Sequence, residues 1–299
     1  MKYLSYLLAA TFAISAGSVH ADYACDPCDP CYSAPSNACC YDECCGFEGY
    51  VDALYWHVCS GSTQRDISGS PDLLLSLDPD YDWGWRLGGN YHRDSWNLGF
   101  RFTWFNSKTV ENFFPEGYGP QQIETLYQFK YRVFDLELGK DCCICNGMIF
   151  RPFIGGKFAT ILVDAHNLNF EDQEIKTDYE GRGLYLGFEN RWELCNFNSC
   201  GWDIPLALIT RLSTGVMYSD FTTTGDFDGA DRRKQCQFVP EHEVYIGLEL
   251  GFDDFLCDAD GFIQLGYESQ YWGWLDNEDE DDITHLGLGG LVLRFGLAF

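Results

Sequence analysis

Apolar and polar side chains alternate along much of this chain, residue by residue. The most regular run is 95–105, in which large apolar residues from Trp96 to Trp104 alternate with residues such as Asn97 and Arg101. Strict alternation predicts β-strands, because successive side chains of a strand point to opposite faces of a sheet. Ten runs of this kind cover residues 47–57, 82–92, 95–105, 125–138, 149–161, 183–193, 202–213, 242–252, 262–272 and 286–299.

The segments between these runs alternate in length. The long segments are acidic and rich in Gly, Asn and Thr, and they cover 58–81, 106–124, 162–182, 214–241 and 273–284. The short segments cover 93–94, 139–148, 194–201 and 253–261. This alternation is typical of transmembrane barrels, whose short turns lie in the periplasm and whose long loops lie outside. We therefore predict an all-β fold, a closed antiparallel up-and-down transmembrane β-barrel of about 10 strands (10–12 allowed).

The last run bears on whether the sheet is open or closed. A strand this apolar would aggregate if it lay at the edge of a sheet. Pairing with the run that begins at Phe47 would remove the edge and close the barrel. A terminal alternating strand ending in Phe also resembles the assembly signal of bacterial outer-membrane proteins, which implies the barrel-assembly machinery as a partner. The residues that carry this resemblance are Leu291, Leu293, Phe295, Leu297 and Phe299.

The N-terminal residues have the character of a secretory signal peptide. Lys2 supplies a positive charge, an apolar run extends from Leu4 to Ile14, and a small-residue cleavage site ends at Ala21. No later stretch of about 18 apolar residues follows, so we expect no transmembrane helix. We divide the chain into a signal peptide (1–21), a Cys-rich periplasmic tail (22–45) and a transmembrane barrel (46–299).

Composition favours a membrane location and argues against nucleic acid. The net charge is −27, which would repel phosphates. Aromatic residues make up 17% of the chain, as expected for a barrel with aromatic girdles at both membrane interfaces. A secreted β-sandwich would also have alternating strands, but long loops at one end fit it less well. We expect the bacterial outer membrane as the location and its lipid as a partner.

The stretch FEGYVDALYWHV at 47–58 opens the predicted barrel directly after the Cys-rich tail. It resembles the first strand of the major-outer-membrane-protein-like porins of chlamydia-related bacteria. The resemblance implies a pore-forming barrel in an envelope that is cross-linked by disulfides.

If the apolar face of each run meets lipid, the opposite face points into the lumen. In the fourth run the alternation slips near Asp135, which predicts a β-bulge. The charged residues predicted to line the lumen are Arg86, Arg101, Lys130, Arg132, Arg151, Lys157, Glu189, Arg191, Arg211, Glu243, Glu249, Glu268 and Arg294, together with Glu48, Asp52 and Asp82.

Three functions remain open at this point. A polar lumen of nearly balanced charge predicts a porin that passes small hydrophilic solutes. Alternatively, ion pairs between these side chains close the lumen and leave a structural or surface-exposed barrel, since barrels of about eight strands are filled by side chains. An outer-membrane enzyme is the third alternative. The sequence has no G-x-S-x-G, H-E-x-x-H or P-loop motif, so we expect no enzyme.

The chain has 15 Cys residues, and exported Cys residues usually form disulfides. An odd number leaves at least one Cys free or bonded to another chain, so we expect Cys-rich envelope proteins as disulfide partners. Two C-x-x-C spacings at 25–31 could instead bind zinc, but the usual second ligand pair is missing, and we expect no cofactor. The candidates on the periplasmic side are Cys25, Cys28, Cys31, Cys39, Cys40, Cys44, Cys45, Cys142, Cys143, Cys145, Cys195, Cys200 and Cys257.

Overall fold

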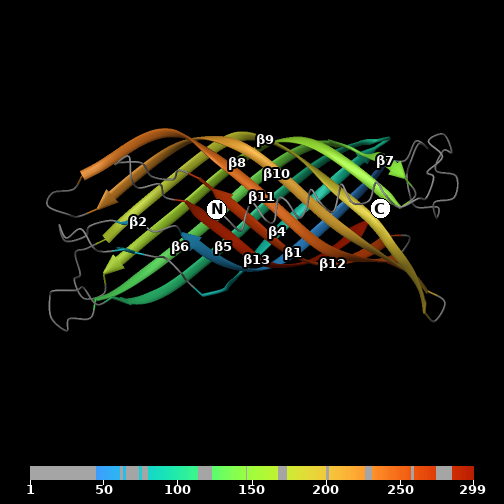
Figure 1. Ribbon diagram of the computed structural model, residues 1–299, viewed down its shortest axis with the longest axis horizontal. Coiled ribbons are helices and arrows are strands. Elements are labelled where there is room, and N and C mark those ends of the chain that lie inside the picture. The colour runs from blue at the N-terminus through green and yellow to red at the C-terminus, as the bar shows by residue number, and fades with distance from the viewer. Residues whose placement is uncertain are drawn as a thin grey trace, which may run out of the picture.

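The alternating runs form strands that close into a barrel in the computed structural model (Figure 1). The wall consists of ten strands, all antiparallel to their neighbours, as predicted. These strands are β1 (Cys45–Ser60), β4 (Asp82–Arg93), β5 (Trp96–Phe113), β6 (Ile123–Lys140), β8 (Met148–Asn167), β9 (Glu174–Ser199), β10 (Trp202–Gly225), β11 (Asp231–Leu256), β12 (Ala259–Trp272) and β13 (Leu286–Ala298). The structure describes residues 45–60, 63–64, 74–75, 80–113, 123–145, 147–167, 174–199, 202–225, 231–256, 259–273 and 285–299.

Two pairings remove the edges of the sheet. β6 pairs with β8, and β1 pairs with β13 over an unbroken register from Glu48 opposite Ala298 to Ser60 opposite Leu286. Beyond that register, the backbone N–H of Phe47 donates to the carbonyl of Phe299 at 3.0 Å, and the N–H of Phe299 donates back at 2.8 Å. The predicted closure by the last strand is therefore confirmed.

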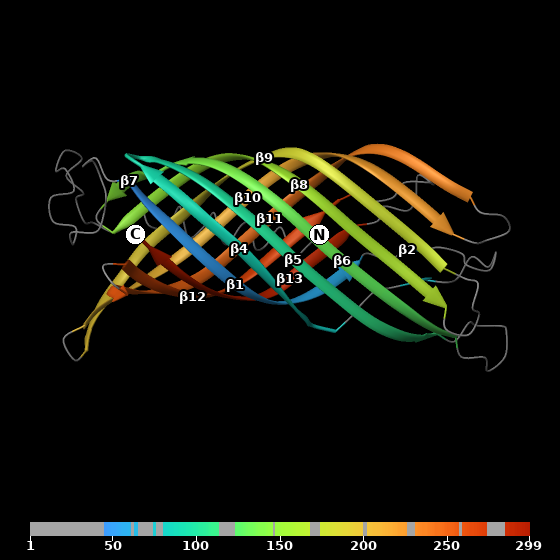
Figure 2. The same cartoon turned by 180° about the vertical axis from the view of Figure 1, so that it is seen from behind.

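Short elements lie at both ends of the barrel. β7 (Cys142–Cys145) pairs with the start of β8 and lies at the same end as the C-terminus (Figure 2). The chain reverses between β4 and β5 at this end in a tight turn, in which Asp94 has a positive φ of 54°. Because short turns lie in the periplasm, this is the periplasmic end of the barrel. At the other end β2 (Thr63–Gln64) and β3 (Leu74–Leu75) form a separate two-stranded sheet.

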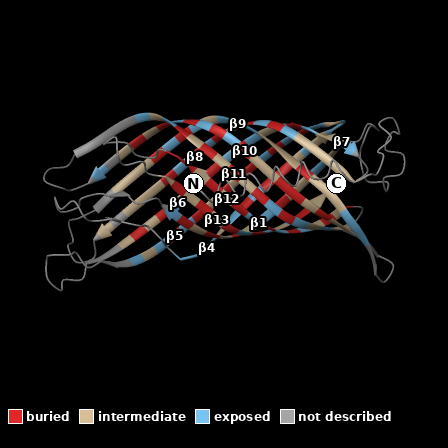
Figure 3. Cartoon of the chain, viewed as in Figure 1, coloured by how far each residue is buried: buried red, intermediate tan, exposed pale blue. Residues whose placement is uncertain are grey.

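Burial alternates along each strand, as Figure 3 shows. The outward face is apolar, and even large side chains on it are exposed, such as Trp83 at 69% and Leu184 at 68%. This band of exposed apolar residues is what lipid contact requires. The part of the chain that the structure describes contains no helix long and apolar enough to cross a membrane.

The strands are longer than the hydrophobic pattern predicts. β9 has 26 residues, β10 has 24 and β11 has 26. Their outer parts include the pairing of the Thr-rich segment 222–224 in β10 with 232–234 in β11. A strand that continues into water needs no apolar face, so its hydrogen-bonded ladder extends past the residues that alternation can detect.

Candidate functional site

The outer half of the lumen is filled by a layer of aromatic side chains, which we call the aromatic layer. Trp56, Tyr131 and Trp272 lie in the centre of this layer, and each has no exposed surface. Tyr131 contacts the other two rings edge-on, with ring centroids 6.3 Å from Trp56 and 6.1 Å from Trp272. The remaining rings of the layer are Phe105, Phe129, Tyr179 and Phe221.

These rings come from six strands on different sides of the barrel: β1, β5, β6, β9, β10 and β12. Trp56 contacts Phe105 at 5.7 Å, and Trp272 contacts Tyr179 at 5.9 Å. The contacts therefore reach across the lumen and not only along the wall. Side chains fill the interior of small barrels in this way.

A layer of charged side chains lies on the periplasmic side of the aromatic layer. The order follows from the strands, because Asp52 precedes Trp56 in β1 and Glu268 precedes Trp272 in β12, and both strands run from the periplasmic end outward. We call the following residues the charge layer: Asp52, Arg86, Arg101, Asp135, Lys157, Glu241, Glu243 and Glu268, with the less buried Glu137, Arg211 and Arg294 beside them.

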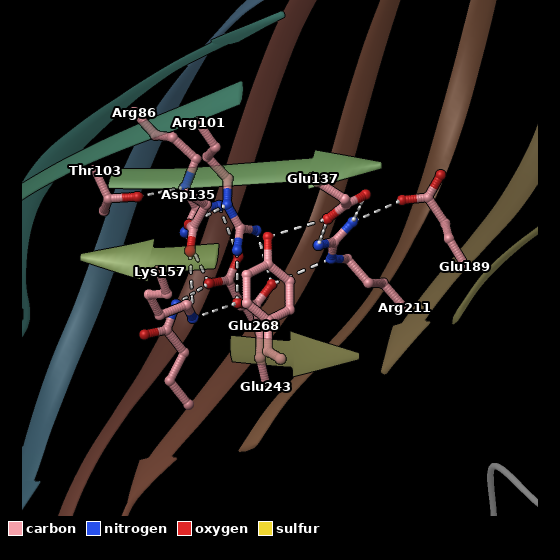
Figure 4. A network of polar contacts seen from close by, with 12 residues as sticks. Arg86, Arg101, Thr103, Asp135, Glu137, Lys157, Glu189, Arg211, Glu243 and Glu268 are labelled. Carbon is pink, nitrogen blue, oxygen red and sulfur yellow. Dashed lines mark hydrogen bonds and ion pairs between the residues drawn. The ribbon is translucent and has the colours of Figure 1, made fainter. Parts of the chain in front are cut away.

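The ion pairs of the charge layer join distant strands (Figure 4). Arg86 in β4 donates two hydrogen bonds to Glu268 in β12, at 2.7 and 2.8 Å. Arg101 in β5 donates two bonds of 2.7 Å to Glu243 in β11. Such two-bond pairs are the strongest form of the interaction and fix both side chains in position. These ion pairs therefore connect strands that are not neighbours in the wall.

Cations of the charge layer also contact the aromatic layer. The guanidinium carbon of Arg86 lies 5.3 Å from the ring centroid of Trp56. The ammonium of Lys157 lies 5.7 Å from the ring centroid of Trp272. Cations at this distance are attracted to the electron-rich face of an aromatic ring. The two layers therefore pack as one unit.

The charge layer borders a polar cavity of about 160 Å³, which Arg101, Glu243 and Glu268 help to line. Arg151 and Arg191 line it, and they pair with Glu189 at 3.2 Å and Glu249 at 3.0 Å. Arg151 also donates a 2.6 Å hydrogen bond to Asp141, which lies outside the strands. Burial opposes ionisation of Asp141, but its hydrogen bond with His92 and the charge of Arg151 hold the pKa of this carboxyl below its usual value.

Comparison with known proteins identifies the family. The family described as Legionella pneumophila major outer membrane protein precursor matches residues 42–294. This match covers the whole barrel up to the last residues of β13. The chain belongs to this family. Its location in the bacterial outer membrane follows, as the sequence predicted. The finer resemblance to porins of chlamydia-related bacteria stays a prediction. No curated protein matches the chain.

Comparison with solved structures supports the barrel fold through one match with a TM-score above 0.5. The outer membrane protease OmpT from Escherichia coli is 8% identical, with a TM-score of 0.52, over 85% of this chain and 96% of that one. The toluene transporter TodX from P. putida is also 8% identical, with a TM-score of 0.33, over 90% and 92% of the two chains.

The match to OmpT corrects one prediction. From the absence of sequence motifs we expect no enzyme. That expectation is contradicted, because the barrel of this chain is similar in fold to a protease. Motifs such as G-x-S-x-G belong to other folds, so their absence does not exclude an enzyme on a barrel. At this identity the likeness shows the fold alone.

The structure places most of the charged residues predicted for the lumen on its inner face. Each of them forms at least one ion pair with another lumen residue. They are Arg86, Arg101, Arg151, Lys157, Glu189, Arg191, Arg211, Glu243, Glu249, Glu268 and Arg294. Glu48 and Asp52 also lie on this face, Glu48 beside His92 at 3.9 Å.

Two residues of the predicted set point the other way. Arg132 is exposed on the outer face, where its guanidinium carbon lies 4.3 Å from the ring centroid of Trp104, and Lys130 is on the same face of β6. β6 pairs with β5 and β8 in unbroken register, so the predicted bulge near Asp135 is wrong. The physical reason is that the apolar face of this run points into the lumen, where Phe129 and Tyr131 belong to the aromatic layer.

The sequence argument missed Asp135, Glu137 and Glu241. For the first two a signal was present, since they alternate with Phe134, Leu136 and Leu138, which face outward. Glu241 precedes Glu243 by two positions and shares its face for the same reason. Part of the aromatic layer carries the same signal, because Trp56 shares the face of Asp52 and Trp272 shares the face of Glu268. Residue type alone gives none, because an aromatic side chain suits the lumen of a filled barrel as well as lipid.

The described cysteines of the predicted set lie at the periplasmic end. Cys45 begins β1, Cys142, Cys143 and Cys145 form β7, and Cys195 lies near the end of β9. Cys142 and Cys195 carry free thiols. The candidates Cys25, Cys28, Cys31, Cys39, Cys40, Cys44, Cys200 and Cys257 lie outside the described residues, so the disulfide pairing stays a prediction.

Proposed function

We propose that this protein is a structural or surface-exposed outer-membrane barrel whose lumen is closed in its folded state. The observation that carries the proposal is the aromatic layer. Trp56, Tyr131 and Trp272 meet across the lumen and have no exposed surface. The two-bond ion pairs of the charge layer support it, because a hydrated solute would have to break them to pass.

A porin for small hydrophilic solutes is the second candidate. The polar cavity on the periplasmic side favours it, since Arg151, Arg191 and their carboxylate partners could bind a hydrophilic solute. Passage beyond this cavity would require both layers to rearrange. The porin therefore needs a second, open conformation, which the closed barrel does not need.

The proposed partners follow from the surfaces of the barrel. The apolar outer face suits the lipid of the outer membrane. The terminal strand β13 suits recognition by the barrel-assembly machinery. The Cys residues of the periplasmic end suit disulfides with Cys-rich envelope proteins, because oxidation occurs in that compartment.

Uptake of a small neutral sugar into proteoliposomes tests the proposal. Vesicles that hold the refolded protein should swell in the sugar no faster than vesicles without protein. A general porin, reconstituted in the same lipid, is the positive control. Swelling by the wild-type protein at a rate near that of the porin would contradict a closed lumen and favour the second candidate.

A further inference from the structure

The charge layer contains more carboxylates than cations among the described residues. Its eight most buried members are five carboxylates and three cations. Arg211 and Arg294 add two cations, but Arg211 also pairs with the carboxylate of Glu137. The layer therefore holds six carboxylates against five cations. An uncompensated charge is very costly in a site without water, so the excess has to be neutralised.

Glu241 is the carboxylate with the least compensation. It has no exposed surface. One of its oxygens accepts a 2.6 Å hydrogen bond from Lys157, whereas the other, Oε2, has no hydrogen-bond partner. By contrast, Glu243 accepts two hydrogen bonds from Arg101 and has Arg211 at 3.4 Å.

Among the residues that the structure describes, the groups around Glu241 supply no second cation. Lys157 in β8 is shared with Asp135 in β6 and Glu243 in β11, each 3.6 Å away. Trp272 lies directly opposite Glu241 in β12, and Gly215 lies opposite it in β10. The other titratable groups nearby are Tyr131 of β6 and Tyr179 of β9, which both contact Trp272 and carry no positive charge. One ammonium therefore serves three carboxylates.

We propose that Glu241 holds a bound proton and that this site makes the charge layer neutral. The ligand is a single proton on a buried carboxyl beneath the aromatic layer. Loss of this proton at high pH would add a negative charge that Lys157, which already serves two other carboxylates, cannot balance. The charge would lie beside Trp272, where the two layers are in contact. The bound proton therefore keeps the charge layer packed against the aromatic layer and so keeps the lumen closed. This site goes beyond the proposed function, because a closed barrel needs no titrating group.

Infrared spectroscopy of the barrel in lipid vesicles at neutral pH tests this site. The wild-type protein should show the carbonyl stretching band of a buried protonated carboxyl. Glu241→Gln should lose this band, and Glu243→Gln should keep it. Absence of the band in the wild-type protein, or its persistence in Glu241→Gln, would overturn the proposal.

Stability in urea gives an independent readout. Glu241→Gln replaces a neutral acid by a neutral amide of the same size, so it should fold and should keep the wild-type midpoint. Glu243→Gln removes a charge that compensates Arg101 and Arg211, so its midpoint should fall. A Glu241→Gln variant that fails to fold, or loses as much stability as Glu243→Gln, would show that Glu241 is ionised. The closed lumen could then still hold, since sugar uptake tests it separately.

Discussion

At the scale of single residues, neighbours in this chain face different solvents. Leu248 is 48% exposed on the outer face, whereas the next residue, Glu249, points into the lumen and pairs with Arg191 at 3.0 Å. Position 248 lies in the middle of the alternating run of β11, opposite the exposed Leu265. A substitution therefore has to be judged by the face it occupies and not by its neighbours in sequence.

Leu248→Arg should destabilise the barrel by about 2–4 kcal/mol, the cost of a charge on the lipid face near the midplane. Leu248→Met, which nearly conserves the volume and stays apolar, should cost about 1 kcal/mol or less. Unfolding by urea in lipid vesicles measures both. Equal stabilities of the two variants would mean that position 248 does not face lipid.

Arg86 is the opposite case, because its charge stabilises two buried carboxylates of the lumen. Arg86→Met should cost about 3–5 kcal/mol, because it leaves Glu268 and Asp52 buried without this partner. Adding Glu268→Met to Arg86→Met should restore part of the loss, since it removes one unpaired charge. A double-mutant cycle in urea measures the coupling. Strictly additive losses would show that the two side chains do not pair in the folded barrel.

At the scale of elements, the seam between β1 and β13 turns a sheet into a barrel. Its last contacts are the two hydrogen bonds between Phe47 and Phe299. The side chain of Phe299 itself is 68% exposed, so it adds little packing within the barrel. A strong effect of this side chain on biogenesis would therefore reflect recognition of the chain and not folded-state stability.

Deletion of Phe299, or Phe299→Asp, should lower the amount of protein in the outer membrane and leave chains in the periplasm. Phe299→Tyr keeps an aromatic ring and is the matched control. Fractionation of cells with quantitative blotting gives the levels. If both variants reach wild-type levels, the barrel-assembly machinery does not recognise β13 through its terminal aromatic residue.

Elements of this fold could be predicted where one face meets lipid and the other meets polar side chains. The run 242–252 is an example, because Ile246 and Leu248 face lipid while Glu243 and Glu249 face the lumen. The run 125–138 failed, because the apolar side chains of β6 at Phe129 and Tyr131 face the lumen, while Lys130 and Arg132 lie on the outer face. Strand ends failed for another reason, because strands in water pair through the backbone without an apolar pattern. The partners of each ion pair depend on register across the barrel, which alternation does not contain.

At the scale of the whole molecule, the wall of the barrel is closed by backbone pairing, and we propose that its lumen is closed by side chains. Backbone pairing closes the wall, so the fold requires no disulfide. We therefore expect the Cys residues predicted for the periplasmic end to serve contacts with other envelope proteins and not the stability of the barrel.

Envelopes separated without reductant should show this protein in bands of high mass that collapse to a monomer on reduction. Removal of residues 22–44, which precede β1, should weaken these bands and leave the barrel folded. Alkylation of free thiols before lysis controls for disulfides that form during preparation. A monomer band of equal strength with and without reductant would exclude a cross-linked network.

Current through single molecules in a planar bilayer decides whether the aromatic layer closes the lumen. The wild-type barrel should give a silent bilayer, although its folded state is confirmed by heat-dependent gel mobility. The double variant Trp56→Ala, Trp272→Ala removes two rings at the centre of the layer and should give stepwise currents or a raised leak. Stepwise currents from the wild-type protein, equal in size to those of the double variant, would contradict a lumen closed by these side chains.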